Sequence, residues 1–409
     1  MMNQVNPLSM QVRGSEMGTR FVITEEQGNI MTAVFNGDKC DDVLISAITP
    51  DKTPVLGDIW LGHVKRVMPN IKAAFVDILP GVTGYLPLSG HDEIKAEQDI
   101  PVQIIKDAVK TKDMMLSADF SISGRFCAMT AGKKGIGISK KITDTGIRSR
   151  LSERAHEVLG SSIASSAETR IGTVIRTNAA DASDQAFLLD LLNTKEAMDN
   201  VISSSNYRTP YSRLYHAPDA EIRLIRDHHG EIDRIVTDIP EEEAKIRSFF
   251  ADSEKITSVL SLYEDESLAL RKLYKLDSLL DEALKKTVWL PSGGSIVLEV
   301  TEALTVIDVN TGKTDKKRSK EENFLQTNIE AAREAARQMR IRNYSGMIMI
   351  DFINMREKSS LKLLEQELIK ALSKDRVTCR FFGFTHLGLA EITREKTTQP
   401  LHEIIRKKS

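Results

Sequence analysis

The most constraining feature of the chain is a pair of short apolar segments, each with an aspartate near its carboxyl end. The segments are 305–310 (TVIDVN) and 347–353 (MIMIDFI), and 321–342 between them has the apolar spacing of a helix with one buried face. A strand, a crossover helix and a second strand form a βαβ unit with parallel strands. The carboxylates of Asp308 and Asp351 then lie at the same edge of the sheet, where open α/β sheets bind ligands. The sequence therefore predicts that Asp308 and Asp351 hold one metal ion.

Asn310 shares a strand face with Asp308, because side chains alternate along a strand. A lysine-rich stretch follows directly, and its Lys313, Lys316 and Lys317 are candidate contacts for the backbone of a nucleic acid. Mg²⁺ suits this pattern, since it takes few carboxylates, keeps several waters and accepts phosphate oxygens as further ligands. It would also lower the pKa of a water and stabilise charge on a phosphodiester under attack. The alternative is that both aspartates only cap the ends of their strands.

Composition sets limits on the remaining functions. The chain has 409 residues, enough for two to four domains, and a net charge of −2, so that any nucleic-acid surface must be local. Its cysteines (Cys40, Cys127 and Cys379) are scattered without a C-x-x-C pair, which argues against a disulfide framework and a cysteine-based zinc site. No apolar stretch has the length of a membrane span and no signal-peptide core begins the chain, so a cytoplasmic location is expected.

Residues 57–122 contain short alternating segments separated by glycine turns. This pattern predicts a small closed barrel of the OB type, which binds single strands by stacking bases on aromatic side chains over a basic groove. Phe75 and Tyr85 are the candidate stacking residues, with Lys65 as a basic neighbour. A position for Phe75 inside the barrel core is equally consistent with the pattern.

A strand predicted at 172–177 ends in the pair Arg176-Thr177. An arginine can bind a phosphate through two parallel hydrogen bonds, and a threonine hydroxyl can add a third. Taken alone, such a pair on a surface has no particular meaning. The other elements predicted nearby and downstream are helices at 144–159, 183–203, 239–252 and 267–285, and strands at 20–24, 30–35, 221–227 and 232–238.

Several motifs in this order resemble those of the ribonuclease E/G family of bacterial endoribonucleases, with a leaning toward the ribonuclease G type. The most specific are LPSGGSIV at 290–297, TEALTVIDVNTG at 301–312, GMIMIDFINM at 346–355 and GFTHLGLAEITR at 383–394. Weaker matches are AAFVD at 73–77, GYLP at 84–87, GISKKI at 137–142 and VIRT at 174–177. The resemblance runs from about residue 20 to about residue 397 and is diffuse between 195 and 280.

The resemblance implies a multidomain fold of the α+β and α/β type. It implies an RNase H-like scaffold formed by 1–56 together with 219–283, an OB-type RNA-binding barrel at 57–122, a 5′-sensor region at 123–218, and a DNase I-like catalytic domain at 284–409. The implied activity is Mg²⁺-dependent hydrolysis of single-stranded RNA that leaves a 5′-phosphate. The implied substrates are ribosomal RNA precursors or messenger RNA.

The resemblance also implies roles for individual residues. Asp308 and Asp351 would bind Mg²⁺, with Asn310 as an auxiliary catalytic residue. A 5′-monophosphate would be sensed by side chains and main-chain groups, namely those of Arg176, Thr177, Gly124 and Ala128. RNA would contact the barrel at Phe75, Tyr85 and Lys112.

One departure concerns the family's C-x-x-C pair, by which two chains share a zinc ion beyond the catalytic domain. This sequence contains no such pair and no small dimerisation domain. A zinc-linked dimer is therefore not expected, and homo-oligomerisation by another route stays open. The alternative function is that of an RNA-binding protein that has kept the fold and lost cleavage together with the dimer.

Overall fold

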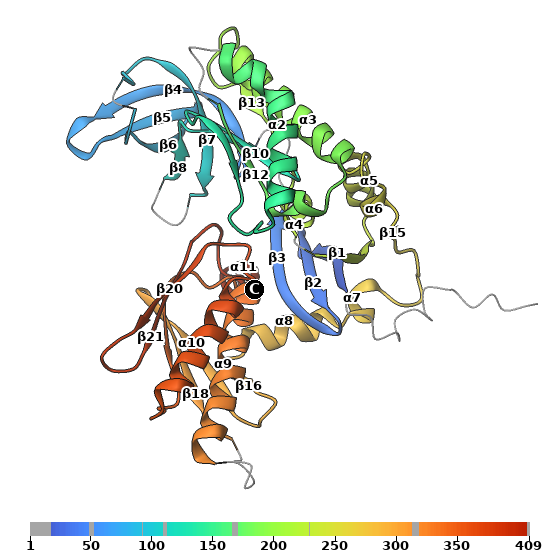
Figure 1. Cartoon of the computed structure of the whole chain (residues 1–409), viewed down its shortest axis with the longest axis vertical. Helices are drawn as coiled ribbons and strands as arrows, with labels where there is room; N and C mark the ends of the chain where they lie inside the picture. Colours follow the sequence, from blue (N-terminus) through green and yellow to red (C-terminus); the bar gives the residue numbers. More distant parts are fainter. Residues whose placement is uncertain are drawn as a thin grey trace, which may run out of the picture. The chain divides into compact units, whose positions relative to one another are not determined.

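The computed structural model describes residues 18–48, 53–91, 93–108, 113–165, 171–228, 230–312 and 319–406. Two compact units divide the chain: one contains 1–48 and 230–409, and the other contains 49–229 (Figure 1). Helices and strands are mixed in both, which confirms the expected α+β character. Residues 219–229, assigned above to the scaffold together with 230–283, fall in the second unit.

The second unit contains a closed barrel of five strands. These are β4 (Ile59–Met68), β5 (Ala73–Leu79), β6 (Val82–Pro87), β8 (Met114–Ser117) and β7 (Asp99–Lys106), and pairing between β4 and β7 closes the barrel. A short 3-10 helix, Pro69–Ile71, connects β4 to β5. Side chains such as Val76, Leu86 and Leu116 fill the interior without solvent exposure. The closed barrel is consistent with the predicted OB type.

A separate four-stranded sheet with two long helices completes this unit. Its order is β11 (Gly135–Ile138), β12 (Ile171–Ile175), β10 (Cys127–Ala131) and β9 (Ser121–Ser123), with α2 (Thr145–Ser165), α3 (Asp184–Ser204) and the 3-10 helix Thr177–Asp181. Ser183 caps α3, because its hydroxyl accepts a hydrogen bond of 3.2 Å from the Ala186 N–H. Strand β13 (Arg213–Tyr215) pairs with β4 and so belongs to the barrel's sheet.

The strand predicted at 221–227 is wrong, since these residues form helix α4 (Ala220–Asp227). Ile222 and Ile225 are both buried, and a spacing of three places them on one side of a helix. The buried Arg226 side chain donates to the Ser123 carbonyl at 2.6 Å and to Asp227 at 2.8 Å. Those polar contacts stabilise the helix more than the local alternation favours a strand. The sequence pattern does not reveal them.

The single helix predicted at 267–285 is interrupted. The structure has α7 (Leu270–Leu273) and α8 (Leu276–Leu284), with Lys275 between them at a φ of 52°. That left-handed conformation ends the first helix and starts the second in a new direction.

The first unit contains two sheets, one of which is built from distant parts of the sequence. Its order is β15 (Leu260–Leu262), β14 (Ile232–Thr237), β1 (Thr19–Glu26), β2 (Asn29–Asn36) and β3 (Lys39–Ala47). Strands β1, β2 and β3 are antiparallel neighbours, whereas β14 is parallel to β1 and β15 to β14. Helices α5 (Pro240–Phe249), α6 (Glu254–Thr257) and α11 (Leu401–Arg406) belong to the same unit.

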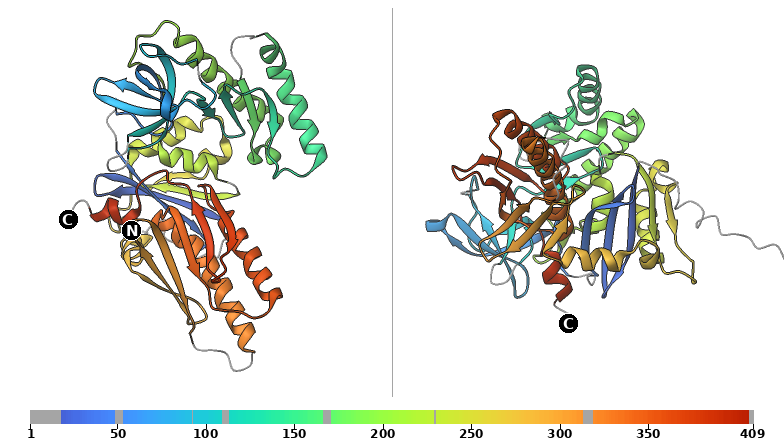
Figure 2. Two further views of the ribbon diagram at one scale, coloured as in Figure 1. Left: turned by 90° about the vertical axis from the view of Figure 1, so that its left-hand side faces the viewer. Right: turned by 90° about the horizontal axis from the view of Figure 1, so that it is seen from below.

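The other sheet of this unit contains the two aspartate strands. Its order is β16 (Thr287–Trp289), β17 (Ser295–Val300), β18 (Leu304–Asn310), β19 (Gly346–Asp351), β21 (Ala390–Arg394) and β20 (Cys379–Phe384). Strand β18 is parallel to β19, and α9 (Lys320–Arg342) makes the crossover, which confirms the βαβ unit. Helices α9 and α10 (Lys358–Leu372) cover one face of the sheet and share its apolar core (Figure 2).

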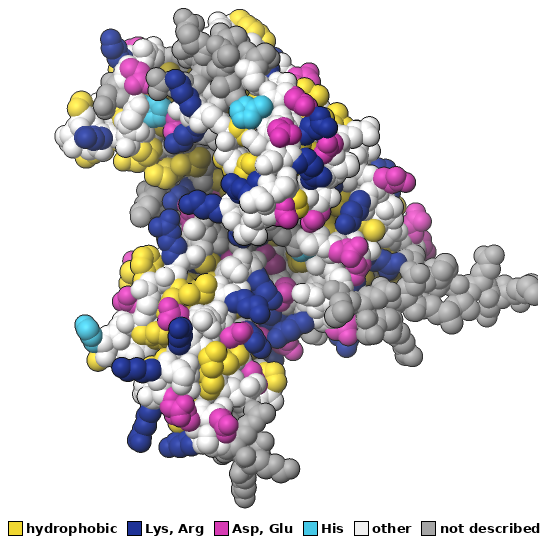
Figure 3. All heavy atoms as spheres, viewed as in Figure 1, with side chains coloured by type: hydrophobic (Ala, Val, Ile, Leu, Met, Phe, Trp, Pro, Cys, Tyr) yellow, Lys and Arg dark blue, Asp and Glu magenta, His cyan; other side chains and the backbone are white. Residues whose placement is uncertain are grey.

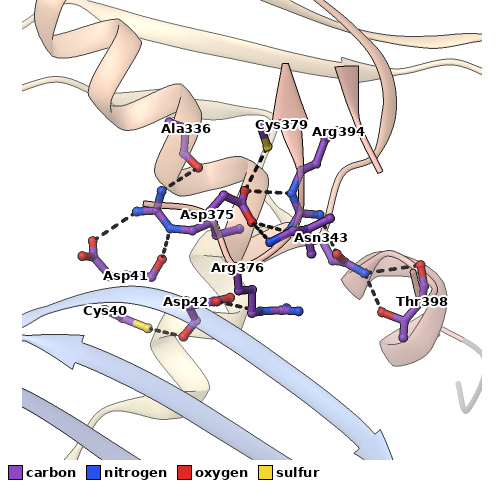
Figure 4. A network of polar contacts seen from close by, with 12 residues as sticks. Cys40, Asp41, Asp42, Ala336, Asn343, Asp375, Arg376, Cys379, Arg394 and Thr398 are labelled. Carbon is purple, nitrogen blue, oxygen red and sulfur yellow. Dashed lines mark hydrogen bonds and ion pairs between the residues drawn. The ribbon is translucent and has the colours of Figure 1, made fainter. Parts of the chain in front are cut away.

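A buried polar network fixes the end of the crossover helix (Figure 4). Arg394 of β21 binds Asp375 through two hydrogen bonds of 2.8 and 3.1 Å, and donates to the Asn343 side-chain oxygen at 2.7 Å. Asn343 terminates α9 in a left-handed conformation and donates to the Thr398 hydroxyl at 2.8 Å. The Arg394 and Asp375 side chains are 0% and 1% exposed, so each depends on the other for compensation of its charge.

No helix in the part of the chain that the structure describes combines the length and the apolar character needed to cross a membrane.

Replacement of Arg394 by methionine should lower the free energy of unfolding by about 3–5 kcal/mol, because it leaves the Asp375 carboxylate buried without its partner. Arg333→Met is the matched control: Arg333 pairs with Glu367 at 2.6 Å but is 59% exposed. An exposed pair of this kind contributes about 0–1 kcal/mol. Denaturant unfolding followed by circular dichroism measures both, and equal effects of the two substitutions would contradict the role given to the buried pair.

Candidate active site

Asp308 and Asp351 are direct neighbours on the sheet. The register of the parallel strands pairs Asp308 with Asp351, at the carboxyl ends of β18 and β19. Both side chains are exposed and lie on the face opposite α9 and α10, because Ile307 and Ile350 point into the core. Within the described residues, neither carboxylate takes part in an ion pair. Two adjacent negative groups repel each other unless a cation lies between them.

Asn310 lies on the same face as Asp308, as the alternation predicts. Its side-chain N–H donates to a carboxylate oxygen of Asp308 at 2.8 Å. This bond fixes the orientation of one carboxylate oxygen and leaves the other for a cation. A polar side chain that orients a ligand in this way is typical of metal sites. The donor set of exposed carboxylates with an amide beside them fits Mg²⁺, which keeps waters in its coordination shell.

Glycines allow two loops to approach each other beside Asn310. A Cβ atom on Gly312 would lie 2.2 Å from the Gly293 backbone, and one on Gly294 would lie 2.7 Å from the Asn310 carbonyl. Any larger residue at these positions would push the loops apart. The close approach holds the end of β18 against the turn that precedes β17, and so positions Asn310.

Helix α9 holds the loops at this edge of the sheet through its own polar side chains. The Asn328 amide donates to the Ile353 carbonyl at 2.8 Å and accepts from the Ile353 N–H at 3.0 Å, just beyond Asp351. Glu330 accepts from the Ser292 N–H at 2.9 Å, and Glu321 accepts from backbone N–H groups that follow Ile353. Burial alone would raise the pKa of Glu330, but hydrogen bonds from Gln326 and Ser292 hold it below its usual value.

Asn328 was missed in the sequence analysis, although a signal for it exists. It is 0% exposed and lies four residues before Ala332 on the buried side of the helix. A polar side chain within an apolar stripe indicates a specific partner, because an unpaired buried amide is costly.

The predicted stacking residues of the barrel lie together on its outer surface. Phe75 and Tyr85 are cross-strand partners with ring centroids 6.1 Å apart at 76°. Phe75 is half-buried while Ala74 and Val76 beside it are buried, so its ring points away from the core. The Arg66 guanidinium lies 4.8 Å from the Phe75 ring centroid. This arrangement offers a base both a ring face and a nearby cation.

The predicted basic contacts are only partly described. Lys65 is 64% exposed and lies 3.4 Å from an oxygen of Asp77. Four others lie outside the described residues: Lys112, Lys313, Lys316 and Lys317.

Arg176 of the predicted 5′-sensor already has two partners. It donates to Asp227 at 2.6 Å and to the Gly124 carbonyl at 3.1 Å. Burial alone would raise the pKa of Asp227, but hydrogen bonds and charge from Arg226, followed by those from Arg176, hold it below its usual value. Asp227 is therefore ionised at neutral pH and orients the guanidinium. No sequence pattern points to Asp227, because the segment 221–227 resembles a strand.

Of the other predicted sensor groups, Gly124 lies in the turn between β9 and β10, and Ala128 lies in β10. The Thr177 hydroxyl lies 2.9 Å from that of Ser139. The Gly124 N–H donates to the Cys127 carbonyl at 2.9 Å, so both of its backbone polar atoms are bound within the protein. Ala128 pairs with Ser123 and Val174 in the sheet. The side chains of Arg176 and Thr177 are thus better placed than the Gly124 amide to meet a phosphate.

Comparison with known proteins supports the same family. The family model described as the Ribonuclease E/G family matches residues 121–397. The chain is 32% identical to Ribonuclease E of Synechocystis sp. over 95% of its own length and 58% of that protein. It is 30% identical to Ribonuclease G of Salmonella typhimurium and to that of Escherichia coli K12, over 86% of its own length and 75% of theirs. The chain belongs to the ribonuclease E/G family.

The extent of these matches differs between the relatives. The chain spans little more than half the length of the cyanobacterial proteins named Ribonuclease E, namely 58% in Synechocystis and 56% in Nostoc. Among solved structures, the Staphylococcus aureus RNase P protein aligns with 19% of this chain at 16% identity and a TM-score of 0.18, which supports no inference about the fold.

Replacement of Asn328 by alanine should lower the free energy of unfolding by about 1–3 kcal/mol, because the Ile353 N–H and carbonyl lose their partner. Asn193→Ala, at an exposed position on α3, is the control. A change of at most about 0.5 kcal/mol is expected there. Denaturant unfolding compares the two variants, and a loss at Asn193 as large as that at Asn328 would refute the positioning role.

Proposed function

We propose that this protein is a Mg²⁺-dependent endoribonuclease that hydrolyses single-stranded RNA in RNA processing or decay. The observation that carries the proposal is the pairing of Asp308 with Asp351 on an exposed sheet face, with Asn310 bonded to one of them. Family membership supports it, since the relatives are named Ribonuclease E and Ribonuclease G. A protein that only bound RNA would gain nothing from two adjacent carboxylates facing a polyanion.

In this proposal the protein groups bind and orient the reactants. Asp308 and Asp351 hold Mg²⁺ from neighbouring strands, and Asn310 keeps the Asp308 carboxylate in place. The bound ion supplies an electrophile that lowers the pKa of water and offsets charge on the phosphodiester. Attack of a water oxygen on the phosphorus, in line with the leaving 3′-oxygen, would form a new P–O bond and break the P–O3′ bond. One water is consumed, and the two products carry a 5′-phosphate and a 3′-hydroxyl.

The proposal extends to the rest of the chain. The barrel would bind single-stranded RNA through Phe75 and Tyr85, with Arg66 as a basic contact. The remaining domain assignments follow the family: an RNase H-like scaffold, a 5′-sensor region and a DNase I-like domain. The same resemblance supports a cytoplasmic enzyme acting on ribosomal RNA precursors or messenger RNA.

We further propose that Arg176 and Thr177 sense a 5′-monophosphate. Arg176 is held by Asp227 and by the Gly124 carbonyl, and this preorganisation favours binding of an anion by the rest of the guanidinium. Thr177 and Ser139 present hydroxyls beside it. The sensing would raise the rate on RNA that carries a 5′-monophosphate.

Replacement of both aspartates by asparagine should reduce cleavage of a 5′-monophosphorylated single-stranded RNA by on the order of 100-fold or more, because the charge that holds Mg²⁺ is lost. Calorimetric titration with Mg²⁺ should show the loss independently of activity. Asp252→Asn, at an exposed position after α5, is the control and should leave both measurements unchanged. If Asp308→Asn with Asp351→Asn cleaves as fast as wild type, the assignment is wrong.

Replacement of Arg176 by alanine should reduce the preference for a 5′-monophosphate over a 5′-hydroxyl by about 10- to 100-fold, as expected for loss of a hydrogen bond between charged groups. The comparison uses the ratio of kcat/KM for two otherwise identical RNAs. Arg208→Ala, an exposed arginine of the same unit, should leave the ratio unaltered. An unaltered ratio in Arg176→Ala would exclude the sensor.

A further inference from the structure

The face of the catalytic sheet that carries the aspartates is not covered by a helix within the described residues. Helices α9 and α10 pack on the opposite face, where they share the core with Ile307 and Ile350. On the open face, large apolar side chains are exposed to solvent, including Trp289 at 74%, Phe382 at 63% and Met347 at 53%. Hydrophobic side chains are visible over β20 and β21 in Figure 3. Exposed apolar patches of this kind mark binding surfaces.

Strand register places Trp289 on the open face. Trp289 pairs with Ser295, which in turn pairs with Asn310, and residues paired across strands point to the same side of a sheet. The preceding residue, Val288, packs against the core on the other side. Trp289 therefore lies two strands away from β18, at a lateral distance of about 10 Å for a strand spacing of about 4.8 Å.

Phe382 lies on the same face beyond the other aspartate. Strand β20 has a bulge at this position, where Phe382 and Gly383 together oppose Glu391. Glu391 pairs with Met349, two residues before Asp351, and Phe381 packs against the core on the other side. Phe382 is thus two strands from β19, again about 10 Å in the lateral direction. The two aromatic rings flank the aspartate pair.

We propose that Trp289 and Phe382 are substrate-binding residues that stack bases of single-stranded RNA on either side of the scissile phosphate. This inference rests on the proposed function and extends it. Every base has a flat aromatic face, so an exposed ring can bind it without regard to sequence. In this arrangement, two bases of the RNA would stack on the two rings. The RNA backbone that joins these bases would then face Asp308 and Asp351.

Charge on this face agrees with base contacts outside the aspartate pair. Glu391 is exposed there and disfavours phosphate close to it, whereas stacked bases are uncharged. Glu299 is also exposed on this face and is paired with Lys286 at 3.1 Å. Arg380, exposed on β20 two residues before Phe382, can bind a phosphate at the margin. A lasting protein partner over the same rings would also cover the two aspartates and exclude the substrate. The occupant must therefore leave after each turnover, as a substrate does.

The experiment scans a 5′-monophosphorylated single-stranded RNA with one abasic nucleotide at a time. With the wild-type protein, an abasic site should lower kcat/KM by about 5- to 100-fold at one position on each side of the cleaved bond, the range for one lost stack. Trp289→Ala should abolish the penalty at one of these positions, and Phe382→Ala at the other. Trp289→Phe and Phe382→Tyr should retain both penalties. Ile369→Ala, 48% exposed on α10 across the sheet, is the control and should keep the wild-type pattern.

A wild-type abasic pattern in both alanine variants would overturn the inference. If those variants also had a reduced solution mass, the face would be an interface between copies of the chain instead. Failure of the proposed function would look different, because Asp308→Asn with Asp351→Asn would then cleave normally. In that event fluorescence anisotropy with the same abasic RNAs still tests stacking: equal affinities of wild type and Trp289→Ala for every RNA would reject it.

Discussion

Parallel pairing of β18 with β19 is the constraint on which the site depends. Parallel neighbours cannot be joined by a tight turn, so the chain must leave the sheet and return through a crossover. Helix α9 provides it, and its buried alanines pack it closely on the sheet. Once the crossover is packed, the register that pairs Asp308 with Asp351 is fixed, because a slip of one residue would turn one of them into the core.

The same helix also sets the loops beyond the two strands. Asn328, Glu330 and Glu321 each bind backbone groups at the carboxyl edge of the sheet. Through these side chains, α9 positions the loops in addition to packing on the sheet, because backbone groups in loops need hydrogen-bond partners where water is excluded. At its other end, the helix stops at Asn343, which the buried Arg394 holds in place. Both ends of α9 are therefore tied to the sheet by polar contacts as well as by apolar packing.

The sequence predicted those parts of the fold that follow from local periodicity. The crossover helix, the two aspartate strands and the position of Asn310 beside Asp308 are determined by apolar spacing and strand alternation, and the structure has them where expected. The segment 221–227 was predicted wrongly as a strand. Its Arg226 is buried in the structure through contacts with Ser123 and Asp227, and Ser123 is far away in the sequence. Asp227 beside Arg176 could not be identified for the same reason: long-range polar partners leave no periodic pattern. Asn328 interrupts the apolar stripe of α9, which indicates a specific partner, but the pattern does not identify Ile353 as that partner.

The first unit contains a buried carboxylate, Asp375, and an exposed pair, Asp308 and Asp351. The way in which the fold treats their charges indicates that the exposed pair requires a cation. Asp375 is buried, and the fold supplies Arg394 for it, because an uncompensated buried charge is too costly to keep. Asp308 and Asp351 are exposed, adjacent and in no ion pair with any described residue. Water lowers the cost of their repulsion but does not remove it. The fold nevertheless orients Asp308 with Asn310 and secures the neighbouring loops with glycines and α9 side chains. Such preorganisation of like charges is understandable if the compensating charge comes from a bound cation rather than from the protein.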